Sequence, residues 1–286
     1  MRVQVHGGAG GEPDEPDERR TVLEEAARVG ADAGSPLDAV EDAISVLESA
    51  RRFNAGVGGA VQSDGVPRTD AGLMTGQGAV GAACAMPGVE HAISAARVVL
   101  EETPHVLIAG QHAVELAGGF GVETGVDLWN EESRERWAEA PKPPSEEPGS
   151  HLEWVRERFG GTDTVGAVAT DGERVAAATS TGGRWFALAG RVGDVPQVGS
   201  GFYASEAGAA SATGAGEDIA RVTLTQRAVT HLEAGLGAQA AADSALETFA
   251  ERTEGGAGLI VISPAGDVGA TFNTDSMQTA VAGDIG

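Results

Sequence analysis

The spacing of apolar residues in the first part of the chain predicts three helices. The first apolar stripe consists of Val22, Ala26, Val29 and Ala33. Its spacing of three to four residues predicts a helix that follows a solvated acidic loop at residues 12–18 and ends near Gly34. A further helix is predicted from about His91 to Glu102, because Pro104 would end it.

The helix between these two has the clearest start signal. Ser35 is suited to cap the helix, Pro36 to fill its first position, and Asp38 to lie in its first turn. The apolar stripe that follows consists of Leu37, Val40, Ile44 and Leu47. Cap and stripe together predict an amphipathic helix.

In the second half of the chain the pattern changes to β-structure. Two apolar segments, 164–170 and 174–180, flank an Asp171-Gly172 dipeptide. This dipeptide is favoured in two-residue hairpins because both positions tolerate positive φ. The pattern therefore predicts an antiparallel hairpin.

The order of elements indicates the fold class. A second hairpin is predicted from segments 258–263 and 267–272, and two helices, about 217–234 and 238–252, precede it. A short strand is predicted at residues 3–5. Helices followed by a hairpin, then helices and a hairpin again, indicate an α+β fold with substantial antiparallel sheet.

A proline-rich segment interrupts this order. Residues 140–150 contain four prolines and follow two tryptophans, Trp129 and Trp137, that lie among acidic residues. Such a segment can neither hold a helix nor join a central strand. We expect residues 140–150 to form an exposed, flexible linker.

The charge balance excludes several classes of partner. The 286 residues include 43 Asp and Glu against 19 Lys and Arg, of which only Lys142 is lysine, so the formal net charge is −24. A field of this sign repels phosphate, and we expect neither nucleic acid nor a membrane surface as a partner. Because 41% of the residues are hydrophobic, the chain can still bury a core.

Cysteine and histidine usage narrows the chemistry. The single cysteine, Cys84, lies in a run of small residues and is expected to be buried as a small hydrophobe. The six histidines lack ligand spacing, so no metal site is expected. The apolar stretch at the N-terminus is too short for a signal peptide and no segment approaches a membrane span, so the expected location is cytoplasmic.

The sequence contains 43 glycines, and each of four glycine clusters, at residues 6–11, 54–59, 180–183 and 213–216, carries one side chain capable of chemistry. The most informative segment is 160–164, where two glycines precede a threonine at the first position of a predicted strand. If the chain were cut before Thr164, that residue would hold a hydroxyl nucleophile and an α-amine. With a reference pKa of about 7.7 to 8.0, the amine could act as the general base. The alternative is an ordinary strand threonine after an aspartate turn.

Several ordered motifs resemble one known family. They are His6-Gly-Gly-Ala-Gly10, Arg52-Phe-Asn-Ala-Gly56, Asp163-Thr-Val-Gly-Ala-Val-Ala169, Thr179-Ser-Thr-Gly-Gly183, Gly190-Arg-Val-Gly-Asp-Val-Pro196, Thr213-Gly-Ala-Gly-Glu217 and Phe272-Asn-Thr274 with Met277. Together they resemble the plant-type asparaginase and isoaspartyl peptidase family of N-terminal-nucleophile hydrolases. The resemblance runs from about residue 3 to residue 280.

The resemblance implies a fold, a maturation step and an activity. It implies a single domain of residues 1–286 built as a four-layer αββα sandwich. It also implies self-cleavage into an α chain, 1–163, and a β chain, 164–286, and a homodimer of such αβ pairs. The implied reactions are hydrolysis of asparagine to aspartate and ammonia, and hydrolysis of isoaspartyl peptides.

The resemblance also implies roles for individual residues. Thr164 would attack the carbonyl of Asp163 during self-cleavage and the side-chain amide of the substrate afterwards. Thr181 would orient the nucleophile. Asn54 matches a family asparagine near the cleavage site, although a turn role in Asn-Ala-Gly stays open.

Four further residues would bind substrate or its transition state. Arg191 would clamp the substrate α-carboxylate and Asp194 its α-ammonium. The alternative is that these two side chains pair with each other across a turn. Thr213 and the Gly214 amide resemble an oxyanion hole, and the same residues could serve as a helix entry loop.

Two features carry weaker implications. His6 resembles a family residue, and a structural histidine at a strand end is at least as good an interpretation. The loop at residues 47–53 corresponds to one that in relatives can hold a sodium ion by backbone carbonyls, a kind of ligation that leaves almost no sequence signature. No cofactor is required for the implied chemistry.

Two other functions stay open. A relative of the same fold hydrolyses the glycan–asparagine bond and shares the nucleophile and the Gly-Arg-Val-Gly-Asp run. Gly182 after Ser180-Thr181 fits the asparaginase branch better, because asparagine is usual at that position in the glycan-cleaving one. A catalytically silent acidic protein that keeps the fold is the third alternative.

The acidity itself resembles that of proteins from salt-loving archaea. The implied substrate carries a carboxylate, so a net charge of −24 cannot serve to attract it. At molar salt the Debye length is about 3 Å and this repulsion matters little. We therefore interpret the charge as an adaptation to a salt-rich solvent.

Overall fold

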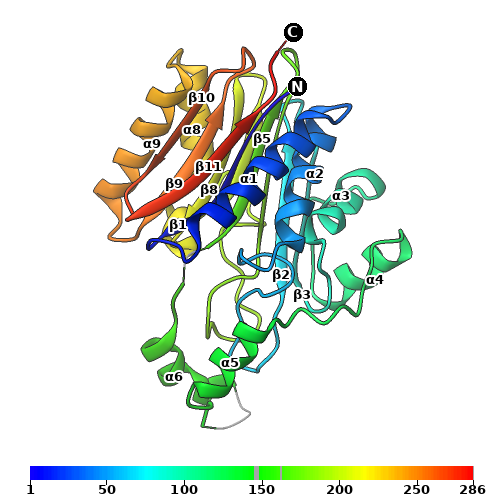
Figure 1. The fold of residues 1–286 in the computed structure, drawn as a ribbon, viewed down its shortest axis with the longest axis vertical. Coiled ribbons are helices and arrows are strands. Elements are labelled where there is room, and N and C mark those ends of the chain that lie inside the picture. The colour runs from blue at the N-terminus through cyan, green and yellow to red at the C-terminus, as the bar shows by residue number, and fades with distance from the viewer. Residues whose placement is uncertain (145–147, 162, 286) are drawn as a thin grey trace.

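The computed structural model describes residues 1–286 except 145–147, 162 and 286, and it contains two β-sheets with helices outside each (Figure 1). The larger sheet has the strand order β11-β1-β5-β6-β2-β3-β4. Its strands are β1 (Arg2–Gly10), β2 (Thr69–Thr75), β3 (Val80–Met86), β4 (Leu107–Ala109), β5 (Val165–Thr170), β6 (Val175–Thr181) and β11 (Ser276–Ala282).

The smaller sheet has the order β10-β9-β8-β7. Its strands are β7 (Phe202–Ser205), β8 (Gly208–Gly214), β9 (Ala257–Ile262) and β10 (Val268–Phe272). Every pairing in this sheet is antiparallel. In the larger sheet only β3 and β4 pair in parallel, among the strands of the described residues.

Helices cover the outer face of each sheet. The larger sheet packs against α1 (Pro16–Ala31), α2 (Pro36–Ser49) and α3 (Ala92–Glu102), and the smaller one against α7 (Gly216–Val222), α8 (Leu224–Glu233) and α9 (Ala238–Arg252). A third buried cluster, which includes Val168, Phe202 and Ile260, lies between the sheets. Helix, sheet, sheet and helix therefore form four layers, as expected for an α+β fold of the N-terminal-nucleophile type.

The predicted hairpins and most predicted helices are present. β5 and β6 pair antiparallel across Asp171-Gly172, with φ +99° at Gly172, and β9 pairs with β10. α3 and α9 span the expected residues, and α2 begins as predicted, because the Ser35 hydroxyl accepts a hydrogen bond from the Asp38 amide at 3.2 Å.

Two helix predictions were wrong in detail. α1 begins at Pro16, inside the expected acidic loop, because proline suits a first helical position and acidic residues favour a first turn. Its buried face consists of Arg19, Leu23, Ala26, Ala27 and Gly30, one position away from much of the predicted stripe. The helix expected over 217–234 is two helices, α7 and α8, separated at Thr223, whose φ of +52° breaks the helical path.

A small lobe lies below the sandwich in Figure 1 and contains the predicted linker. It consists of α5 (Glu131–Glu139), a 3₁₀ turn (Pro148–Ser150) and α6 (His151–Arg158), while α4 (Gln111–Gly119) lies beside α3. Residues 145–147 of the linker lie outside the described part. Pro141 accepts a hydrogen bond from the Trp154 indole at 2.7 Å, so the start of the linker is tied to the lobe.

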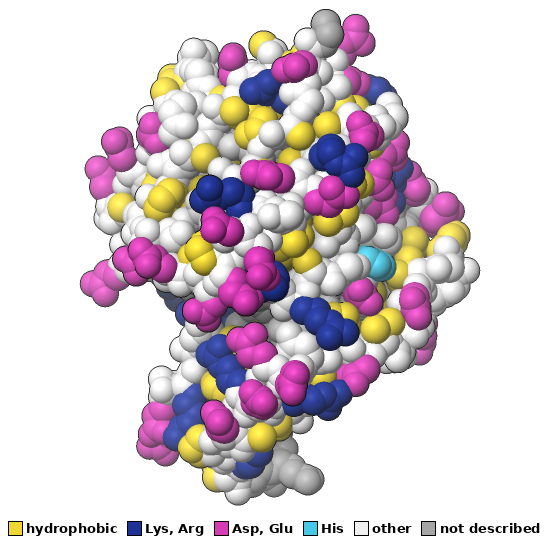
Figure 2. Space-filling model, in the orientation of Figure 1, with side chains coloured by type: hydrophobic (Ala, Val, Ile, Leu, Met, Phe, Trp, Pro, Cys, Tyr) yellow, Lys and Arg dark blue, Asp and Glu magenta, His cyan; other side chains and the backbone are white. Residues whose placement is uncertain are grey.

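The surface carries the excess of acid seen in the sequence. Figure 2 shows carboxylates over the whole visible face with arginines among them. Within the described part of the chain, no helix is long and apolar enough to cross a membrane. Cys84 is buried on β3 as expected, and burial raises the pKa of its thiol to about 12.

Candidate active site

Thr164 lies directly before β5, at the centre of the larger sheet. Its side chain is buried, with 6% of the residue exposed. The hairpin with β6 brings it beside Thr181, the last residue of that strand. The hydroxyl of Thr164 donates to the hydroxyl of Thr181 at 3.3 Å. The structure thus brings the two expected threonines together.

The carbonyl of Asp163, which precedes Thr164, is held by two donors. The side-chain amide of Asn54 donates to this oxygen at 2.8 Å, and the hydroxyl of Thr181 donates to it at 3.3 Å. Donors on a carbonyl oxygen stabilise the negative charge that develops there when a nucleophile attacks. This arrangement favours attack at the Asp163–Thr164 peptide bond.

Asn54 has a fixed orientation. The amide of Ala60 donates to its side-chain oxygen at 2.8 Å, which turns the side-chain nitrogen toward the Asp163 carbonyl. The same nitrogen also donates to the carbonyl of Gly183 at 2.6 Å. These contacts hold the Asn54 side chain against the Asp163–Thr164 peptide group, and its part in self-cleavage stays a prediction.

Arg191 and Asp194 direct polar atoms toward the same position beside Gly216. A methyl group added at Gly216 would lie 2.5 Å from Asp194 Oδ1 and 2.9 Å from Arg191 Nη2. No ion pair between the two side chains is found in the described structure, and Arg191 Nε donates instead to Glu217 at 2.8 Å. Arg191 Nη2 and Asp194 Oδ2 are buried, and neither has a hydrogen-bond partner among the described residues.

Unpartnered buried charges are costly, so this pair is suited to a ligand that satisfies both. Burial raises the pKa of Asp194 to about 6, although the neighbouring Arg191 acts to lower it. A small molecule with one carboxylate and one ammonium would supply a partner to each side chain. The alternative of mutual pairing between Arg191 and Asp194 is not what the structure shows.

Thr213 and Gly214 end β8, on the sheet that faces β5. The amide of Ala9 donates to the Thr213 hydroxyl at 3.2 Å, which links β8 to β1. Gly214 has φ +136°, and a methyl group there would lie 2.3 Å from the carbonyl oxygen of Gly256. Only glycine fits this position, and the oxyanion role of the two residues stays a prediction.

His6 lies between the two sheets and fits the structural interpretation. The ring is fully buried, and its Nε2 lies 3.0 Å from the hydroxyl of Ser211. Burial lowers the pKa of His6 to about 3, although the Thr164 backbone acts to raise it. The Ser211 hydroxyl also lies 2.7 Å from the Thr179 hydroxyl. The neutral His6 ring therefore belongs to a buried hydrogen-bonded group that links the two sheets.

Residues just before Thr164 lie against Arg184 and Arg191. Arg184 stacks on Phe159 with its guanidinium 4.0 Å from the ring centre, and Arg191 lies 5.6 Å from the same ring. Arg184 also donates to the carbonyl of Gly161 at 2.8 Å. An open cleft of about 920 Å³ is lined by residues that include Asp163 and Asn54.

The loop at residues 47–53 keeps its carbonyl oxygens engaged. The carbonyl of Leu47 accepts a hydrogen bond from the Ala50 amide, and the carbonyl of Ala50 accepts one from the Phe53 amide. The carbonyl of Arg52 accepts one from the guanidinium of Arg19. A carbonyl oxygen has a second lone pair, so these contacts leave room for a cation ligand. Sodium at this loop stays a prediction, and no chemical step below depends on it.

The sequence motifs assigned no role to three further residues of the site, although Glu217 ends the motif at residues 213–217. Glu217 accepts from Arg184 at 3.0 Å as well as from Arg191, and these arginines lower its pKa against the effect of burial. Glu48 is fully buried on α2 and accepts from the Ser180 hydroxyl at 2.6 Å. Gln62 contacts the backbone of Arg191. Each acts on a partner far away in the sequence.

The four-layer arrangement of helix, sheet, sheet and helix is the fold of the N-terminal-nucleophile hydrolase class, and Thr164 lies directly before its central strand β5. Comparison with known proteins then identifies the family: residues 2–285 match the model described as Asparaginase, and the chain belongs to this family. It is 39% identical to the plant-type L-asparaginase of Pyrococcus abyssi, over 98% of this chain and 95% of that protein. It is 38% identical to the human isoaspartyl peptidase/L-asparaginase, over 99% and 93%.

Proposed function

We propose that the protein is a self-processing amidohydrolase that converts L-asparagine to L-aspartate and ammonia and also hydrolyses isoaspartyl peptides. The observation that carries the proposal is the Asp163–Thr164 bond, whose carbonyl has two donors while the following threonine lies at the start of β5. The names of its relatives support the same activity.

In the self-cleavage step, the Thr164 hydroxyl attacks the Asp163 carbonyl carbon. The hydroxyl donates to Thr181, and Thr181 donates to the carbonyl oxygen, so a proton can pass along this path as the C–O bond forms. Both contacts are 3.3 Å, longer than the usual 2.7 to 2.8 Å between hydroxyl groups, and must shorten in the reaction. The acyl group moves from nitrogen to oxygen, and water then hydrolyses the ester.

The second reaction uses the same hydroxyl with a new base. Cleavage leaves Thr164 with a free α-amine that takes the proton of its hydroxyl. The hydroxyl attacks the side-chain amide carbon of asparagine and forms an acyl-enzyme, and ammonia leaves after taking a proton. Water then releases aspartate. In an isoaspartyl peptide the leaving group is an amine.

Arg191 and Asp194 set which amino acid can bind. The guanidinium of Arg191 binds the α-carboxylate and Asp194 binds the α-ammonium, because each has a buried atom in need of a partner. This leaves the side-chain amide as the part of the substrate that reaches the nucleophile.

A comparison of substrates tests this proposal against the glycan-cleaving alternative. We expect purified, processed protein to release ammonia from L-asparagine and free amino acid from a β-aspartyl dipeptide. We expect no sugar release from glycosyl-asparagine at the same enzyme concentration. Activity on glycosyl-asparagine alone would assign the chain to the glycan-cleaving branch, and processing without activity on any of the three would reject all these reactions.

The pH dependence of kcat/KM for asparagine should show two ionisations on its acid side. Log kcat/KM is expected to fall with a slope of one below the pKa of the Thr164 amine, about 7.7 to 8.0 in a free chain. Below about pH 6 the slope should increase to two, because Asp194 then takes a proton and loses the charge that binds the ammonium.

The Asp194→Asn variant serves as the check on this assignment. It should retain only the first ionisation, with a slope of one down to pH 5. Burial also raises the pKa of Asp70 to about 6. A second break that persists in the Asp194 variant would assign the ionisation to Asp70 and contradict the role given to Asp194.

A further inference from the structure

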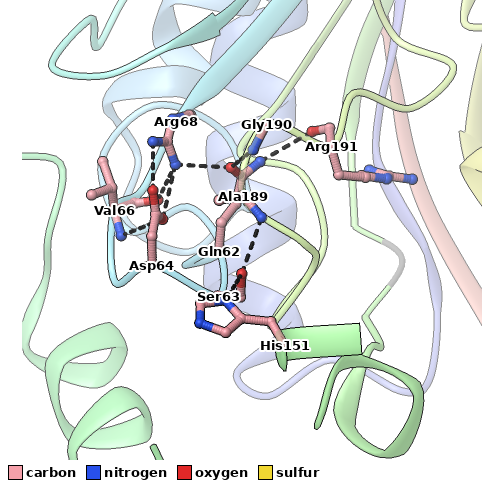
Figure 3. Close-up of polar contacts among 9 residues, drawn as sticks. All are labelled: Gln62, Ser63, Asp64, Val66, Arg68, His151, Ala189, Gly190 and Arg191. Carbon is pink, nitrogen blue, oxygen red and sulfur yellow. Dashed lines mark hydrogen bonds and ion pairs between the residues drawn. The ribbon is translucent and has the colours of Figure 1, made fainter. Parts of the chain in front are cut away.

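Gln62 lies behind the proposed substrate site. Its side chain forms hydrogen bonds with the loop that carries Arg191 and with Arg68, which holds it in place. Gln62 is buried, with 3% of the residue exposed. Its side-chain nitrogen donates to the carbonyl of Arg191 at 3.0 Å, and its oxygen accepts from the amide of Gly190 at 2.8 Å (Figure 3). The side chain thus grips two successive residues of the loop by their backbone.

Gln62 is itself held in place. Arg68 donates to the side-chain oxygen of Gln62 at 2.9 Å. The same guanidinium pairs with Asp64, with contacts of 3.0 and 2.7 Å to the two carboxylate oxygens (Figure 3). This ion pair fixes the direction of the glutamine amide, because an amide oxygen in contact with Arg68 leaves the nitrogen to face Arg191.

A neighbouring residue anchors the start of the same loop. The hydroxyl of Ser63 accepts from the amide of Ala189 at 3.0 Å and lies 3.0 Å from Nδ1 of His151 on α6 (Figure 3). Residues 189–191 are therefore attached to residues 62 and 63 at three successive positions.

The loop needs such attachment. Residues 189–193 lie outside any helix or strand, and Gly190 has φ +83°, a conformation that glycine adopts readily. Glu217 holds the Arg191 guanidinium at Nε only, so the position of Nη2 depends on where the backbone lies. A charged group displaced by an ångström loses much of its value in binding.

We propose that Gln62 is a positioning residue for the carboxylate clamp. Its amide fixes the backbone at Gly190 and Arg191 and thereby sets where the guanidinium meets the α-carboxylate of an amino-acid substrate. This inference rests on the proposed function for the role of Arg191, and it adds a residue that determines affinity for the α-carboxylate without touching the substrate.

The test is a Gln62→Met variant, which keeps the length of the side chain and removes its polar atoms. Two hydrogen bonds to the loop are lost, and we expect KM for asparagine to rise about tenfold while kcat changes less than about twofold. Affinity for the product L-aspartate, measured by calorimetry, should fall by the same factor. Self-cleavage before Thr164 should proceed at the wild-type rate, because Asp163 and Thr164 have no contact with Gln62 among those described.

Gln239→Met is the matched control. Gln239 makes the same pair of contacts with a backbone, donating to the Ala270 carbonyl at 3.0 Å and accepting from its amide at 3.1 Å, between α9 and β10. This variant should keep the wild-type KM. In an Arg191→Ala background, Gln62→Met should add less than about a twofold change in aspartate affinity, whereas a general defect would add its full effect.

Three results would overturn the inference. They are an unchanged KM and aspartate affinity in a folded Gln62→Met protein, a loss confined to kcat, and slowed self-cleavage. A wild-type protein that binds aspartate but does not hydrolyse asparagine would refute the proposed function and leave the aspartate measurement as the test of Gln62.

Discussion

A Thr164→Ala protein is expected to remain one chain of 286 residues, whereas the wild type resolves on a denaturing gel into fragments 1–163 and 164–286. The alanine removes the hydroxyl that attacks the Asp163 carbonyl, so the peptide bond survives even though Asn54 still donates to that carbonyl. Hydrolysis of asparagine should fall on the order of 10⁶-fold, the scale of nucleophile loss in other hydrolases.

Mass spectrometry and N-terminal sequencing measure the outcome. Thr164→Ser, which keeps a hydroxyl, should still cleave. Thr170→Ala is the matched control, because Thr170 is a buried threonine at the far end of β5 from Thr164 and its hydroxyl bonds the Pro264 carbonyl, away from the cut. A Thr164→Ala chain that still splits at this bond would contradict the proposed mechanism. Cleavage would then no longer distinguish the proposed enzyme from a catalytically silent protein of the same fold.

Elements of the fold that depend on contacts between residues close in sequence were predicted well, and elements that depend on long-range packing were not. α2 was predicted well because its cap and stripe are local, and the Ser35–Asp38 contact spans only three residues. The break at Thr223, whose φ is +52°, was missed because no local pattern in the sequence marks it. β11 escaped prediction because it is a half-buried edge strand.

The same distinction applies to the site. Thr164, Thr181, Asn54, Arg191 and Asp194 were all predicted from motifs, and the structure brings the first three into one hydrogen-bonded group. Glu217 ends the motif at residues 213–217 but was given no role, and Gln62 lies in no motif, because each becomes relevant only through a partner that is 26 or 129 residues away. A residue that acts by positioning another residue far along the chain is not marked by a local spacing pattern in the sequence.

An Arg191→Ala protein should bind asparagine roughly 10- to 100-fold more weakly as judged by KM, because charge-assisted hydrogen bonds are the strongest contacts available to a carboxylate. The net charge of −24 makes this loss more severe at low ionic strength, since the rest of the protein repels an anionic group. Self-cleavage should continue, because the donors to the Asp163 carbonyl are Asn54 and Thr181.

Two further variants separate the geometry of the guanidinium from its charge. Arg191→Lys keeps the charge but loses the planar fork, so its KM should lie between those of wild type and Arg191→Ala. Arg221→Ala removes the same charge from an exposed site on α7, where Arg221 pairs only with Asp218, at 2.8 Å, among the described residues, and should leave KM within about twofold. If Arg191→Ala and Arg221→Ala changed KM equally, the effect would be one of overall charge and Arg191 would have no place in the clamp. A lysine variant with the wild-type KM would instead show that a point charge suffices, and the positioning of the fork by Gln62 would lose its purpose.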